Sequence, residues 1–212
     1  SLKALIKPPS DDWYACDWDF DQVEARIFTS EAGDKVGIEK YKDNEKDYHT
    51  ENAALMFQTL PHLVTKWLRT IAKAIGFGLP YGLSDYKLTE RIFTVFNKVN
   101  EAKTVELRIA FEKVNHICMQ YLEGIRKSAL KVVDVPVELK RFWGLEDNAK
   151  VGMVHNKNGF YRYFNLDDVL GNKKLEGSVM RAAGNYPIQS FAADLFKFVL
   201  KRFYDRLVRE GL

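Results

Sequence analysis

The sequence has the size and composition of a folded globular protein. Its 212 residues can bury a sizeable core, as one large domain or two modest ones. A content of 46% hydrophobic and 29% charged residues argues against disorder. The net charge of +3 indicates no partner by itself, and two cysteines exclude a disulfide framework or a cysteine cluster for metal. The low cysteine count favours a reducing compartment. No apolar run approaches the roughly 18 residues of a membrane span, so we expect no membrane partner.

Hydrophobic spacing and breaker residues predict a chain dominated by helices. A short, aromatic-rich strand is expected over residues 13–20, after the breaker run Pro8-Pro9-Ser10. The charged stretch 33–47 predicts a loop or a frayed element. In the mixed region 131–174, Asn156-Lys157-Asn158-Gly159 predicts the turn of a hairpin over 151–164. Helical spacing is found over 22–30, 48–57, 64–77, 85–121 (two or more helices), 175–183 and 187–209.

Positive charge is concentrated in two segments. Residues 52–84 contain no acidic residue but include Lys66, Arg69 and Lys73, and residues 197–209 carry five basic residues against Asp205. Such clusters fit an anionic partner. They fit two solvated helix faces equally well, so charge alone leaves both interpretations open.

The acidic stretch DWDFDQVEAR, residues 17–26, places aspartates at every second position. On a strand, Asp17, Asp19 and Asp21 would share one face, where like charges repel unless a cation lies among them. A calcium loop of the EF-hand type is excluded, because its sixth and twelfth positions require Gly and Glu and hold Gln22 and Phe28 here. Two hypotheses remain: a solvated edge strand, or an aspartate at the end of a strand that binds magnesium.

The segment RTIAKAIGFGLPYG, residues 69–82, carries two cations and two aromatic rings at intervals of four. Arg69, Lys73, Phe77 and Tyr81 would therefore follow one face of a helix. Cations bind phosphates, and aromatic rings stack on a nucleobase. This pattern predicts a nucleotide polyphosphate as ligand, and the alternative is an amphipathic helix with incidental cations.

Four segments resemble motifs of the family A (polymerase I-like) DNA polymerases, in the order found in that family. RTIAKAIGFGLPYG resembles motif B, R-x3-K-x3-F/Y-G-x2-Y-G, and DFDQVEAR (19–26) resembles motif A, usually written DYSQIELR. DYHTENAALMF (47–57) is similar to the DIHT segment between them, and RAAGNYPIQSFAADLFK (181–197) resembles the segment that follows the fingers. The resemblance extends from Trp13 to Lys197.

This resemblance implies an α+β fold in which a mainly helical fingers subdomain is inserted into a partial palm with a small antiparallel sheet. Residues 1–50 would be a palm segment with motif A, residues 51–175 the fingers with motif B, and residues 176–212 a palm helix. The implied activity is DNA-directed DNA polymerisation in replication or repair, with primer–template DNA and a deoxynucleoside triphosphate (dNTP) as partners.

The resemblance also implies roles for individual residues. Asp19 corresponds to the catalytic, metal-binding aspartate of a two-Mg²⁺ site, and Phe20 would offer its backbone carbonyl to the second metal. Lys73 would protonate the leaving pyrophosphate. Glu24 would exclude ribonucleotides by crowding the sugar 2′ position. The remaining implied contacts are His49, Arg69 and Lys73 to the triphosphate, Phe77 to sugar and base, Tyr81 to the templating position, and Arg181, Asn185 and Gln189 to primer–template DNA.

The sequence departs from the family pattern at several points. Asp21 stands where Ser or Thr is usual, Gly76 where Asn is usual, and Ser190-Phe191 where Gly-Ser/Thr is usual. The H-D-E segment of motif C, which carries the second metal-binding aspartate, does not occur in the sequence. We therefore expect a fragment, of phage or split-gene origin, that does not polymerise alone. A downstream segment or a second polypeptide would supply the missing carboxylate.

Two other functions remain open from the sequence. A single-subunit RNA polymerase-like nucleotidyltransferase would use related motifs in the same way, although Glu24 and the DYHT segment favour DNA synthesis. A non-catalytic nucleic-acid-binding module would use the same basic segments. A basic helical scaffold protein would leave four ordered motifs unexplained.

Overall fold

The computed structural model describes residue 10 and residues 19–42, 46–96 and 100–211. Most of the strand predicted over 13–20, including Asp17, lies outside these residues. Asp19 and Phe20 are described and have no regular secondary structure.

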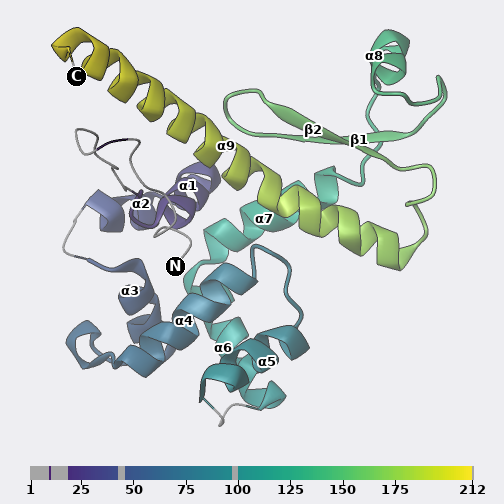
Figure 1. The fold of residues 1–212 in the computed structure, drawn as a ribbon. Helices are drawn as coiled ribbons and strands as arrows, with labels where there is room; N and C mark the ends of the chain where they lie inside the picture. Colours follow the sequence, from purple (N-terminus) through teal and green to yellow (C-terminus); the bar gives the residue numbers. More distant parts are fainter. Residues whose placement is uncertain (1–9, 11–18, 43–45, 97–99, 212) are drawn as a thin grey trace.

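The described chain is mainly helical with one small antiparallel sheet, as the sequence predicted (Figure 1). The sheet consists of β1 (Val151–His155) and β2 (Tyr161–Asn165). The helices are α1 (Val23–Ala32), α2 (Lys35–Lys42), α3 (Tyr48–Met56), the short 3₁₀ helix η2 (Pro61–Leu63), α4 (Lys66–Gly78), α5 (Asp85–Phe96), α6 (Glu101–Val114), α7 (His116–Ser128), α8 (Val137–Phe142) and α9 (Lys173–Glu210). None of these helices is long and apolar enough to cross a membrane. The division into palm and fingers stays a prediction.

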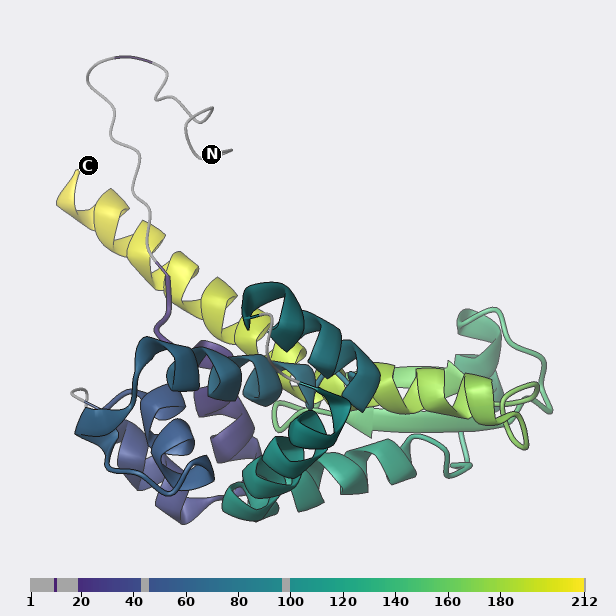
Figure 2. The same cartoon turned by 90° about the horizontal axis from the view of Figure 1, so that it is seen from below.

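Helix α9 runs across the molecule, and the other elements are arranged around its first two thirds (Figures 1 and 2). Helices α1 and α7 pack against it, and the hairpin lies along its amino-terminal half. Helices α3, α4, α5 and α6 form a separate group. Three buried clusters of apolar side chains hold these parts together: one within the α3–α6 group, one between α1, α7 and α9, and one under the hairpin. The clusters are Ala53, Met56, Ile71, Ala72, Ile75, Leu79, Leu88, Ile92, Leu107 and Phe111 in the α3–α6 group; Ile27, Phe28, Cys118, Leu122 and Ile188 between α1, α7 and α9; and Ala129, Val154, Phe164, Leu166 and Ala183 under the hairpin.

Helix α4 forms where the sequence predicts it, because its apolar positions recur every four residues. Thr65 caps its amino terminus by accepting a hydrogen bond from the Leu68 N–H (3.3 Å). Ile71 and Ile75 are fully buried, and full burial of such a side chain contributes about 1.5–3 kcal/mol. The opposite face, with Arg69 and Lys73, is left for other contacts.

The hairpin also forms as predicted. Strand β1 pairs antiparallel with β2 from Val151↔Asn165 to His155↔Tyr161. The side-chain Oδ1 of Asn156 accepts hydrogen bonds from the N–H groups of Asn158 (2.9 Å) and Phe160 (3.1 Å), which closes the turn.

Two expectations about secondary structure were wrong. Residues 35–42 form helix α2 rather than a loop or a frayed element, because tertiary contacts stabilise a segment of weak periodicity. Tyr41 is buried, its ring stacks on Tyr48 (5.3 Å between centroids), and the Arg26 guanidinium lies 5.0 Å from its centroid.

The second error concerns α9, which is one continuous helix rather than two. Proline inside a helix costs about 3 kcal/mol, since it removes a hydrogen bond and crowds the preceding turn. Here Pro187 lies on the buried face of α9 with Ala183, Gly184 and Ile188, so packing of that face offsets the local cost.

We predict that Gly152→Ala destabilises the protein while Gly124→Ala does not. A Cβ at position 152 would lie 1.9 Å from the backbone oxygen of Ala129, which cannot move without shifting the chain. The expected loss is about 3 kcal/mol in the free energy of unfolding. A Cβ at position 124, inside α7, meets nothing within 4 Å, so this control should gain about 0.5–1 kcal/mol. Urea unfolding of both variants tests the prediction, and equal stabilities would contradict it.

Candidate functional site

An open cleft with a volume of about 600 Å³ lies between the start of α1, the start of α3 and one face of α4. Asp19 and Phe20 line it at one side, and Arg69, Lys73 and Phe77 line it from α4. His49 and Glu24 also face it. The structure therefore brings together, from three separate segments, most of the residues that the sequence singled out.

A left-handed backbone turn leads from Asp19 into α1. Gln22 has φ 52° and ψ 33°, a conformation that is uncommon outside glycine. Its side-chain Oε1 accepts a hydrogen bond from the Tyr48 N–H (3.2 Å), which joins this turn to the start of α3. Arg26 donates from Nε to the Asp21 carbonyl (3.0 Å) and from Nη1 to the Tyr41 carbonyl (2.9 Å). These bonds fix the path of the chain next to Asp19.

The carboxylates at this turn have different surroundings. Asp21 accepts hydrogen bonds from the Gln22 amide (2.9 Å) and from Arg26 Nη2 (3.5 Å). The extra carboxylate that departs from the family pattern thus pairs with a neighbouring cation. Asp19 is exposed at the cleft, and its Oδ1 accepts from the Phe20 N–H (2.9 Å).

Asp19 offers one carboxylate to a metal ion, not a complete set of ligands. Within the part of the chain that the structure describes, no three His, Cys, Asp or Glu side chains are grouped to hold a metal. Magnesium is commonly bound by one or two carboxylates together with substrate phosphates. The exposed Asp19 carboxylate, opposite two cations that suit phosphates, fits that kind of site.

At the cleft face of α4, the cations have different partners. Arg69 makes a two-pronged ion pair with Asp47, with Nε–Oδ1 2.9 Å and Nη2–Oδ2 2.8 Å. Lys73 is exposed, and its Nζ lies 5.7 Å from the centroid of the Phe77 ring. Lys73 is thus the more accessible positive charge.

His49 is buried beside these cations. It is 4% exposed, and its ring centroid lies 5.5 Å from that of Phe77. Burial, with smaller contributions from Arg69 and Lys73, lowers the pKa of His49 to about 4, although Asp47 opposes the shift. Its Nδ1 has no hydrogen-bond partner among the described residues. The imidazole is therefore neutral at pH 7, and its unpartnered Nδ1 is buried.

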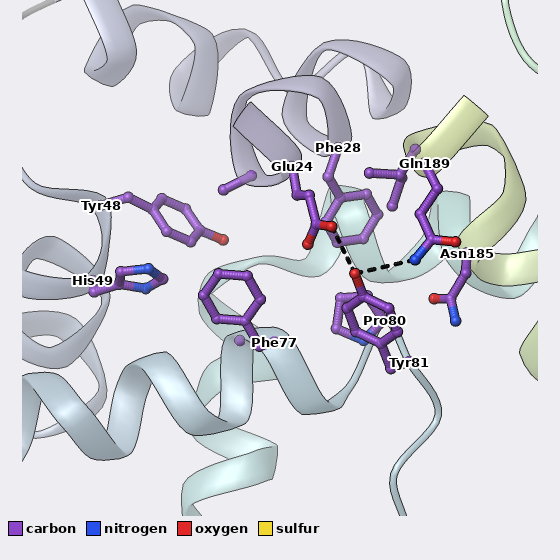
Figure 3. Close-up of a pocket in the computed structure, with 12 residues that line it drawn as sticks. Glu24, Phe28, Tyr48, His49, Phe77, Pro80, Tyr81, Asn185 and Gln189 are labelled. Carbon is purple, nitrogen blue, oxygen red and sulfur yellow. Dashed lines mark hydrogen bonds between the residues drawn. The ribbon is translucent and has the colours of Figure 1, made fainter. Parts of the chain in front are cut away.

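A smaller, mainly apolar pocket with a cavity volume of about 30 Å³ adjoins the cleft, between α1, α4 and α9 (Figure 3), and shares Glu24, His49 and Phe77 with it. At its edge, the Tyr81 hydroxyl donates to Glu24 Oε1 (2.7 Å) and accepts from Gln189 Nε2 (3.3 Å). Asn185 lines the same pocket. Glu24, Tyr81 and Gln189 come from three different motif segments of the sequence, and they meet at the Tyr81 hydroxyl.

Arg181 lies further along, against the turn after α4. Gly82 has φ +68°, and a Cβ there would lie 2.4 Å from Arg181 Cγ. The close approach of this arginine stem thus requires glycine. Arg181 is exposed and lies on the same α9 face as Asn185 and Gln189, at intervals of four residues.

Sequence reasoning missed Arg126 on α7. Its Nη2 donates to the backbone carbonyls of Leu79 (2.9 Å) and Pro80 (3.2 Å), which ties the end of α4 to α7. Burial lowers the pKa of Arg126. No pattern signals this residue, since an arginine on an amphipathic helix is usually solvated and its partners are 46 and 47 residues away.

The comparisons with known proteins agree with this arrangement. A family model described as DNA polymerase family A matches residues 1–212. The chain therefore belongs to DNA polymerase family A.

Similar proteins include the thermostable DNA polymerase I of Thermus thermophilus, 28% identical over 200 residues, which are 94% of this chain and 21% of that protein. The DNA polymerase I of Caldicellulosiruptor bescii is 30% identical over 197 residues, which are 92% of this chain and 20% of that protein. The chain thus spans about a fifth of the length of these curated relatives. They are bacterial, and the phage origin stays a prediction.

Among solved structures, the POL domain of Pol1 from M. smegmatis, in complex with DNA primer-template and dNTP, matches with a TM-score of 0.67 at 25% identity. The match covers 92% of this chain and 30% of that one.

We predict that His49 makes the stability of the protein fall between about pH 6.5 and pH 4. In this range the unfolded chain protonates the imidazole while the folded protein keeps it neutral, so protonation favours unfolding. The contribution is complete above about pH 6.5 and decreases by about 2–3 kcal/mol as the pH falls to 4. Urea unfolding of wild type and His49→Gln across this range should show converging free energies at low pH.

Met56→Ala is the control, since it opens a cavity in the same helix without removing a titratable group. Its deficit in unfolding free energy should be equal at every pH. A parallel offset for His49→Gln would contradict the prediction.

Proposed function

We propose that this chain is the nucleotide-selecting part of a DNA-directed DNA polymerase, which adds deoxynucleotides to a primer 3′ end on a DNA template. The observation that carries the proposal is the cleft in which Asp19 faces Arg69 and Lys73, with Phe77 beyond them. Family membership and the names of the bacterial relatives support it. Replication or repair in the cytoplasm of a bacterium, or of a phage-infected cell, is the setting we infer.

The cations of α4 would bind the triphosphate. Phosphoryl transfer depends mainly on positioning and on stabilisation of charge. Arg69 presents a planar guanidinium and Lys73 an exposed ammonium at the cleft, and His49, which also lines it, would be the third contact to the triphosphate. As the primer oxygen bonds to the α-phosphorus and the bond to the bridging oxygen breaks, Lys73 would transfer a proton from Nζ to the leaving pyrophosphate.

The aromatic end of the same face would receive the sugar and base. Phe77 offers a ring beside the sugar and base, and Tyr81 lies next to the position where a templating base would stack. Glu24 is held by the Tyr81 hydroxyl (2.7 Å), so its side chain would stay fixed where it crowds a 2′-hydroxyl.

Asp19 and the carbonyl of Phe20 are the groups of this chain that would bind magnesium. When bound, the metal would lower the pKa of the primer 3′-hydroxyl and neutralise charge on the phosphates. A second carboxylate would come from a motif C segment outside this sequence or from a second polypeptide.

Primer–template DNA would lie along α9. Arg181, Asn185 and Gln189 form a polar stripe on one face of the helix, and Gln189 also contacts Tyr81. Hydrogen-bonding side chains in such a stripe suit base edges and backbone near the insertion site.

We predict that Asp19→Asn in the full protein lowers primer extension about a thousandfold or more, since it removes a group that stabilises charge in the transition state. Asp21→Asn, two residues away, is the matched control and should stay within several-fold of wild type. Primer-extension rates measure both. No primer extension by the wild type, with DNA binding unaffected by Asp19→Asn, would favour the non-catalytic binding module.

We also predict that Glu24→Ala raises incorporation of ribonucleotides relative to deoxynucleotides at least about ten-fold. Tyr81→Phe removes the same hydrogen bond but keeps the Glu24 side chain, so it should retain most of the discrimination. Competition between dATP and ATP in single-nucleotide extension gives the ratio. A wild-type preference for ATP would favour the RNA polymerase alternative.

A further inference from the structure

The ion pair between Asp47 and Arg69 joins the start of α3 to the cleft face of α4. Both oxygens of the carboxylate are engaged, by Arg69 Nε (2.9 Å) and Nη2 (2.8 Å). The two side chains are 31% and 41% exposed, so the pair is partly shielded from water. Two parallel hydrogen bonds fix the plane of a guanidinium as well as its position.

Asp47 is itself held in place. It is the N-cap of α3, where Oδ1 accepts hydrogen bonds from the Thr50 N–H (2.8 Å) and the Thr50 hydroxyl (2.9 Å). Helix α3 packs against α4, with Ala53 and Met56 in the same buried cluster as Ile71. The Asp47 carboxylate is therefore held in a defined position relative to α4, by its N-cap hydrogen bonds and by the packing of α3 on α4.

Asp47 uses only one edge of the guanidinium. Arginine has five N–H donors, and Arg69 Nη1 makes no hydrogen bond to any residue that the structure describes. Arg69 also lines the cleft that Lys73 and His49 face. One edge is thus fixed to the protein while the other remains available to an anion.

The pair persists at any pH at which the protein would work. Burial alone would raise the pKa of Asp47, but hydrogen bonds from Arg69 and Thr50 outweigh it and lower the pKa to about 2. Asp47 is therefore ionised throughout the neutral range.

We propose that Asp47 is a positioning residue that holds the guanidinium of Arg69 in the orientation that binds the triphosphate. Asp47 would set the affinity for the nucleotide without touching it. This inference rests on the proposed function, since it assigns the anion in the cleft as the triphosphate of a dNTP.

The test uses Asp47→Asn in the full protein. Asparagine is as good an N-cap as aspartate, so the substitution keeps the start of α3 but removes the charge and one acceptor. Without the Asp47 carboxylate the Arg69 guanidinium would be held less firmly, and small displacements of a group that contacts a ligand weaken binding strongly. We expect KM for dATP to rise about ten-fold while kcat stays within about two-fold.

Two further measurements separate positioning from a merely structural role. In an Arg69→Gln background, Asp47→Asn should leave KM unchanged, since the residue through which it acts is gone. Inorganic tripolyphosphate lacks sugar and base, so calorimetric titration should show it weakened in parallel with dATP. Asn100→Ala, which removes the cap of α6 that binds the Lys103 N–H, should lower Tm but leave KM unchanged.

The possible outcomes are distinct. Unchanged affinity in Asp47→Asn, with wild type binding dATP, would overturn the positioning role alone. Tighter binding would also overturn it, because Asp47 would then compete with the triphosphate for Arg69. If wild type neither binds dATP nor extends a primer, the proposed function fails and the inference fails with it.

Discussion

The site depends on the division of α4 into two faces. Ile71 and Ile75 are fully buried against the neighbouring helices, and this burial leaves Arg69, Lys73 and Phe77 on the side that faces the cleft. Because the buried and the cleft-facing residues alternate along one helix, a rotation of α4 about its axis would move both groups of side chains together. The hydrophobic core therefore determines not only that α4 folds but also where its charges lie.

Contacts from elsewhere in the chain then complete the arrangement around this helix. Asp47 binds Arg69 near the amino-terminal end, and Glu24 and Gln189 meet at the Tyr81 hydroxyl beyond the carboxyl end. The segments that supply these contacts are far apart in sequence, and each carries one of the family motifs. Within this chain, each of these motif segments thus provides a side chain that contacts another of them.

The sequence predicted the features that have local causes. Four-residue spacing identified α4, and Asn156 to Gly159 identified the hairpin turn. The sequence did not predict the features that depend on tertiary contacts. Helix α2 depends on the stacking of Tyr41 with Tyr48, and α9 continues through Pro187 because that face is buried. Of the site, the motifs identified the residues that line the cleft. Arg126 and the partner of Arg69 were missed, because a side chain whose partner is distant in sequence leaves no periodic signal.

The attachment of Arg126 to the carbonyls of Leu79 and Pro80 has a mechanical consequence. The Arg126 hydrogen bonds hold the backbone itself at the carboxyl end of α4. The Asp47–Arg69 ion pair near the amino-terminal end joins two side chains, which have rotatable bonds. The 13 residues of α4 form a lever roughly 20 Å long. If it turns about its gripped end, a tilt of about 10° displaces the far tip by roughly 3 Å, about the length of one hydrogen bond. The pivot is therefore remote from Arg69, and the greatest displacement belongs to the residues at the amino-terminal end of α4.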